Sequence, residues 1–134
     1  MTPAWMRSGI LAAVLSPLMI GSAAEAQSES KVVAVASDGV LRLAHFASVN
    51  PDCTSRGITV VRVTDAPAHG TVRIRRDKGF TTFRKQQQCD DRRVDGTTVE
   101  YRPEHRYLGP DKVGLDIIFP TGNEWTRVYD ITVR

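Results

Sequence analysis

Three histidines, His45, His69 and His105, are the residues of this sequence best suited to bind a transition metal. A zinc or copper site gathers three or four ligands, and neighbouring ligands commonly share a short spacing such as H-x-H. The three histidines are far apart along the chain and show no such spacing. We therefore expect no metal or other cofactor. An exported metal-binding protein or metal-dependent enzyme that uses these histidines stays an alternative hypothesis.

Three acids, Asp38, Asp65 and Asp111, lie near the ends of predicted strands, where their oxygens could bind calcium. Calcium takes six to eight oxygen ligands in proteins. An aspartate in a turn more often accepts hydrogen bonds from nearby backbone N–H groups. The sequence leaves calcium binding open.

Motifs for hydrolytic catalysis are missing from the sequence. It contains no G-x-S-x-G nucleophile motif, and no serine of residues 27–134 is adjacent to a histidine. Asp90 and Asp91 are neighbouring carboxylates, but Arg92 and Arg93 follow them directly, which indicates a salt-bridged surface loop. We expect that the protein is not an enzyme.

Basic residues are concentrated between positions 73 and 93, which hold eight Lys or Arg and three Asp, whereas the whole chain has a net charge of +3. From this segment we predict that Arg73, Arg75, Arg84 and Lys85 contact an anionic partner, either an envelope polymer or an acidic protein surface. Nucleic acid would fit the charge but not the export predicted below. The alternative is a solvated surface whose charge only keeps the protein soluble.

Residues 1–26 have the pattern of a secretory signal peptide. A basic residue precedes an apolar run over 10–20, and the sequence AEA at 24–26 offers a cleavage site before Gln27. The apolar run is about half of the roughly 20 residues that a membrane-spanning helix needs, and a proline interrupts it. We therefore predict a cleaved signal, a periplasmic or secreted protein, and no membrane span in residues 27–134.

Two cysteines, Cys53 and Cys89, follow the predicted signal. In an oxidising compartment an even number of cysteines favours disulfide formation, and here only one pairing exists. Closing this loop stabilises the fold by roughly 3.5–4 kcal/mol in the chain-entropy model. A reactive thiol or a metal site is the alternative, although the sequence has no C-x-x-C motif.

Short apolar runs alternate with turn residues over residues 27–134, and no segment keeps the helical period of 3.6. This spacing predicts an all-β, immunoglobulin-like β-sandwich of about seven strands as one domain over 27–134. The strands are expected at 31–36, 40–46, 57–65, 71–75, 81–88, 97–102, 113–119 and 125–134, with the weakest pattern at 81–88. Residues 27–31 are predicted to be a flexible lead, and residues 77–79 a turn.

The predicted core consists of apolar strand residues: Val61, Val63, Val72, Ile74, Val99, Tyr101, Leu115, Ile117, Ile131 and Val133. The run GITVVRV at 57–63 is apolar on both faces, so the sequence leaves its register open.

Four short segments carry a family resemblance when taken in order: APAHGTV at 66–72, VEYRP at 99–103, YLGPD at 107–111 and DITV at 130–133. Together they resemble the immunoglobulin-like, cadherin-like modules of bacterial secreted and surface proteins. The chain departs from that pattern because it holds a single module and a cysteine pair. The resemblance implies the sandwich fold and a role in adhesion, binding or scaffolding. It also implies structural roles for Pro67, His69, Gly70, Tyr101, Pro103, Tyr107, Gly109 and Asp111.

The physical roles expected of these positions need no ligand. His69 and Gly70 would form a turn in which glycine adopts a positive φ, and Pro103 would end the preceding strand. Tyr107 would plug one end of the sandwich. The Asp111 side chain would accept hydrogen bonds from backbone N–H groups.

The leading hypothesis is therefore a small exported binding or structural module without catalytic activity. A further alternative is a periplasmic enzyme inhibitor that acts through an exposed loop at residues 86–96, braced by the disulfide.

Overall fold

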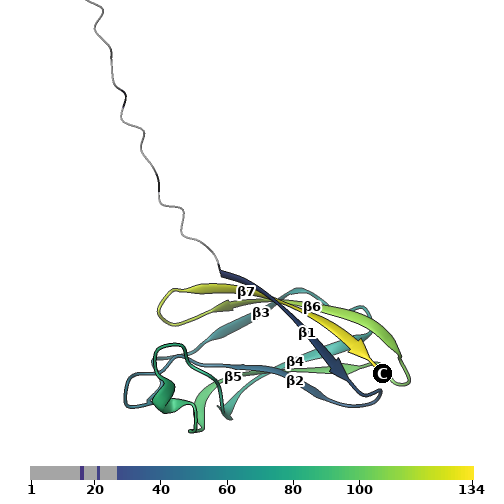
Figure 1. Ribbon diagram of the computed structural model, residues 1–134, viewed down its shortest axis with the longest axis horizontal. Coiled ribbons are helices and arrows are strands. Elements are labelled where there is room, and N and C mark those ends of the chain that lie inside the picture. The colour runs from purple at the N-terminus through teal and green to yellow at the C-terminus, as the bar shows by residue number, and fades with distance from the viewer. Residues whose placement is uncertain (1–15, 17–20, 22–26) are drawn as a thin grey trace, which may run out of the picture.

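The computed structural model describes residues 16, 21 and 27–134 of the chain. The predicted signal peptide therefore lies outside the described residues, apart from positions 16 and 21. The described residues form an all-β sandwich of seven strands, which confirms the predicted fold class (Figure 1). The strands are β1 (Gln27–Val35), β2 (Leu41–Phe46), β3 (Val60–Asp65), β4 (Gly70–Gly79), β5 (Val94–Pro103), β6 (Gly109–Ile118) and β7 (Glu124–Val133).

The strands form two sheets, one in the order β1-β7-β6-β3 and the other in the order β2-β5-β4. β1 runs parallel to β7, and the other neighbours are antiparallel. The predicted flexible lead is wrong, because residues 27–31 already pair with residues 125–129 of β7. Figure 1 shows that the starts of β1 and β7 and the β4–β5 loop lie at one end of the sandwich, opposite the C-terminus.

The core lies between the two sheets and contains most of the predicted residues. Val99, Tyr101, Leu115, Ile117, Ile131 and Val133 are buried, and Val61 and Val72 pack against them while partly exposed. Val63 and Ile74 are 39% and 38% exposed, so their place in the predicted core is wrong. Both lie on edge strands, β3 and β4, which have a neighbour on one side only.

Two local predictions between β4 and β5 are wrong. The expected turn at 77–79 belongs to β4, whose pairing with β5 continues to the pair Gly79–Val94. The expected strand at 81–88 is a loop that ends in a single 3-10 turn, Gln87–Cys89. Asp90 holds this loop by accepting a hydrogen bond from the backbone N–H of Phe83 at 2.8 Å.

The disulfide between Cys53 and Cys89 is present, as predicted. Cys89 is fully buried and forms a small second core with Val49 and Val94. The bond therefore ties the β4–β5 loop to the turn that follows β2. In the part of the chain that is described, no helix has the length and apolar character needed to cross a membrane.

Candidate functional site

The three histidines lie in three separate environments. The His45 side chain lies on the outer side of the β2-β5-β4 sheet but is buried there, and it contacts Thr98 and the Val94 carbonyl. His69 stacks on the Tyr107 ring with centroids 4.1 Å apart. His105 contacts the Asp38 carboxylate at 2.7 Å on the surface. Within residues 27–134, no three histidine, cysteine or acidic side chains come together as a metal site.

Asp111 is the centre of a polar cluster at the end of the sandwich that holds the C-terminus. Its carboxylate accepts hydrogen bonds from the backbone N–H groups of Ala68, His69 and Lys112 at 2.9–3.1 Å and from the Tyr101 hydroxyl at 2.6 Å. Burial opposes ionisation of Asp111, but these hydrogen bonds outweigh it and hold its pKa below the usual value. The cluster ties the segment just before β4 to β5 and β6.

The other residues of the family pattern surround this cluster. Tyr107 donates a hydrogen bond to the Pro110 carbonyl at 2.6 Å, and Gly109 has a positive φ of 134°. Gly70 has no positive φ, which corrects the expected reason for a glycine there. A Cβ at Gly70 would instead collide with the Tyr101 ring. Pro67 precedes β4, and Pro103 is the last residue of β5.

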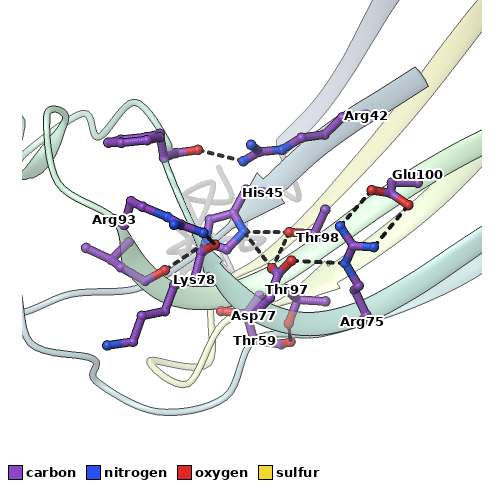
Figure 2. A network of polar contacts seen from close by, with 12 residues as sticks. Arg42, His45, Thr59, Arg75, Asp77, Lys78, Arg93, Thr97, Thr98 and Glu100 are labelled. Carbon is purple, nitrogen blue, oxygen red and sulfur yellow. Dashed lines mark hydrogen bonds and ion pairs between the residues drawn. The ribbon is translucent and has the colours of Figure 1, made fainter. Parts of the chain in front are cut away.

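Figure 2 shows a polar network on the outer face of the β2-β5-β4 sheet. Arg75 donates to both carboxylate oxygens of Glu100, at 2.8 and 3.3 Å, and to Asp77 at 3.0 Å. Thr98 donates to the other oxygen of Asp77 at 2.5 Å, and this bond holds the pKa of Asp77 below its usual value. Arg75 is therefore already paired with two acids of the protein.

His45 joins this network from β2. Its Nδ1 lies 2.8 Å from the Thr98 hydroxyl, and its Nε2 lies 3.0 Å from the Val94 carbonyl oxygen. Gly79 and Gly96 leave room for the ring, since a Cβ at either position would come within 2.8 Å of a ring nitrogen. Burial lowers the pKa of His45, although the Val94 carbonyl and the Asp77 carboxylate, 3.5 Å from Nδ1, act in the opposite direction.

The remaining bases of the 73–93 segment have a different environment from Arg75. Seven of the eight are exposed and form no ion pair with an acid of the described residues: Arg73, Arg76, Lys78, Arg84, Lys85, Arg92 and Arg93. They follow β4 and continue into the β4–β5 loop. Arg73 lines a hollow of about 300 Å³ on the outer side of the sheet.

Arg84 lies apart from Arg73 and Arg75, at the end of the sandwich where β1 and β7 begin. Its guanidinium lies 5.2 Å from the ring centroid of Trp125. Arg84 and Trp125 line a pocket of about 360 Å³ together with Gln27, Glu29 and Arg127. The structure therefore divides the predicted basic surface between the outer face of β4 and the pocket at this end.

Sequence reasoning missed three residues of that pocket, Glu29, Trp125 and Arg127. A signal was present, because Tyr129, Ile131 and Val133 alternate along one face of the last strand. Extending that period of two toward the start of β7 puts Arg127 and Trp125 on the buried face. A charged residue on the buried face of a strand is unusual, and it therefore marks a candidate binding site.

Calcium binding receives no support from the positions of the three acids. Asp38 contacts His105, and Asp111 is saturated by the cluster described above. Asp65 ends β3 and pairs in register with Gly114.

The chain matches no protein-family model and no curated protein. The solution structure of amebosin aligns with 82% of this chain and with 100% of its own length, at 12% sequence identity and a TM-score of 0.40. A likeness at this level supports no conclusion about fold or function, so both rest on the residues described above.

Proposed function

We propose that this protein is a small exported binding module, without catalytic activity, that holds an anionic polymer on its exposed cations. One observation carries the proposal. Seven of the eight bases at 73–93 are exposed and form no ion pair with a described acid. Their charge is therefore available to a partner.

The distribution of these cations favours a polymer over a single small anion as the main partner. They follow one strand, β4, and the loop after it, so that positive charge recurs along the surface. A chain with repeating negative groups can meet several of them at once, and each added contact strengthens binding. Acidic glycans of the cell envelope have this chemistry, and the resemblance to secreted and surface modules agrees with it.

The full chain, titrated with polygalacturonate at low and then at high salt, tests this proposal. Neutral dextran serves as the control polymer. We expect saturable binding of polygalacturonate that weakens steeply with salt, because added ions screen the contacts between exposed charges. Equal binding of both polymers, or no binding of either at low salt, would contradict the proposal.

Two alternatives receive less support from the geometry. A metal-dependent role would need His45, His69 and His105 together, and they lie in separate places. An inhibitor acting through residues 86–96 fits the bracing of residues 86–93 by the disulfide, although residues 94–96 belong to β5. Specific capture of one acidic protein, with no binding of polygalacturonate, would favour the inhibitor.

A further inference from the structure

The buried face of β7 ends in a charged residue. Tyr129 is fully buried, and Arg127, two residues earlier on the same face, has a side chain that is only 11% exposed. Its guanidinium lies 5.2 Å from the ring centroid of Phe46 and 5.7 Å from that of Trp125. A charged group is rarely buried to this extent unless all of its hydrogen-bonding groups have partners.

The protein supplies only part of what Arg127 needs. Glu29 of β1, which lies opposite Arg127 in the register, accepts one hydrogen bond at 2.6 Å. The Nε of Arg127 and the hydroxyl of Tyr129 are both buried without a hydrogen-bond partner among the described residues. Arg127 lines the pocket and Tyr129 does not, so an acceptor oxygen that enters from the pocket would satisfy the Nε of Arg127.

The outer side of the pocket carries a second, more available cation. Arg84 comes from the β4–β5 loop and contacts Gln27 through one long hydrogen bond of 3.4 Å. It forms no ion pair with an acid in the described part of the chain. Its guanidinium is thus free to bind a carboxylate through two parallel hydrogen bonds.

The size and lining of the pocket limit what it can hold. About 360 Å³ is near the lower end of ligand pockets, which suits one ring-sized group. Trp125 supplies apolar surface, while the Glu29 carboxylate can accept hydrogen bonds from hydroxyl groups.

We propose that this pocket binds a single carboxylate-bearing sugar residue. Arg84 would bind the carboxylate, and a ring or hydroxyl oxygen would accept from Arg127. This inference rests on the proposed function, since the sugar would be one residue of the acidic polymer.

Tryptophan fluorescence tests the pocket directly. The chain has two tryptophans, so the full chain with Trp5→Phe retains only Trp125. We expect glucuronate to change its emission in a saturable way and glucose to have no effect at the same concentrations. Arg84→Gln should weaken glucuronate binding by about tenfold, because a charge-assisted contact is lost. Lys112→Gln, an exposed cation of β6 outside the pocket and outside the 73–93 segment, is the matched control and should leave glucuronate binding unchanged.

The outcomes separate the two proposals. If polygalacturonate binds but glucuronate gives no saturable response, the pocket inference is wrong and the proposed function stands. If glucuronate binds and the polymer does not, the proposed function is wrong. If glucose competes as well as glucuronate, or Lys112→Gln weakens binding as much as Arg84→Gln, the assignment of the carboxylate to Arg84 is overturned.

Discussion

Arg75 of β4 reaches diagonally across to Glu100 of β5, and two hydrogen bonds of 2.8 and 3.3 Å join its guanidinium to the carboxylate. Asp77 contacts the same guanidinium at 3.0 Å. These acids compensate the charge of Arg75, which distinguishes it from its unpaired neighbours. The number of bases in the 73–93 segment therefore overstates the charge that a partner can meet.

Neutralising Arg75 should leave polymer binding nearly unchanged. Arg75→Gln removes a cation that already has two acids of the protein as partners, whereas Lys85→Gln removes an exposed cation with none. Titrations of the two variants with polygalacturonate should show weaker binding for Lys85→Gln only. A larger loss for Arg75→Gln would mean that the polymer displaces Glu100.

Tyr101→Phe should destabilise the fold without affecting polymer binding. The substitution removes the 2.6 Å hydrogen bond to Asp111 and leaves the buried carboxylate with its backbone donors only. Loss of a hydrogen bond to a charged group costs about 1.5–3 kcal/mol. Urea unfolding measures the change in the free energy of unfolding, and a loss below about 0.5 kcal/mol would contradict the role given to this pair.

Acidification should destabilise the protein through His45. Burial lowers the pKa of His45, while the Val94 carbonyl, Asp77 and Asp95 oppose the shift and Arg42 adds to it. The unfolded state then binds a proton more readily than the folded state, so stability present above about pH 6.5 is lost as the pH falls. Urea unfolding at pH 7.5 and pH 5 should show this loss.

His45→Gln is the matched variant for that measurement, because its amide keeps polar groups near Thr98 and Val94 without titrating in this range. Its stability should depend less on pH between 7.5 and 5 than that of the unchanged protein. The same dependence in both proteins would assign the effect to other groups.

Removing the disulfide should cost about 4 kcal/mol of stability, because the loop that it closes spans 36 residues in sequence. The double variant Cys53→Ala and Cys89→Ala should also bind glucuronate more weakly, since the β4–β5 loop that carries Arg84 loses its tie to the turn after β2. Thermal unfolding and the Trp125 titration measure the two effects. Unchanged stability would show that the second core holds this loop without the bond.

The period of two in the sequence was enough to predict the sandwich and most of its core. It is unambiguous where one face is buried, as at Leu115 and Ile117. The same period wrongly predicted that Val63 and Ile74 are buried, because the pattern of one strand does not show which strands lie at sheet edges. The end of β4 was missed because Asp77 and Gly79 are common in turns, whereas here pairing with β5 and the close approach of His45 decide their conformation.

The candidate site was less predictable than the fold. Arg84 was identified from its charge, but its contact with Trp125 joins segments 41 residues apart in sequence. The pairing of Glu29 with Arg127 depends on the parallel register of β1 and β7, which nothing in the local sequence specifies. Glu100 of the neighbouring strand β5 lies opposite Arg73 in the register but pairs with Arg75, which the sequence alone does not indicate.

The most direct test of the central claim compares two charge-reversed variants in the polygalacturonate titration at low salt. Lys85→Glu with Arg92→Glu reverses two unpaired cations of the β4–β5 loop outside the pocket. Lys112→Glu with Arg134→Glu makes the same change in net charge away from that loop. We predict that the loop variant binds the polymer at least about tenfold more weakly and that the control variant binds almost as the unchanged protein does. Equal losses in the two variants would contradict the claim, because net charge alone would then account for binding.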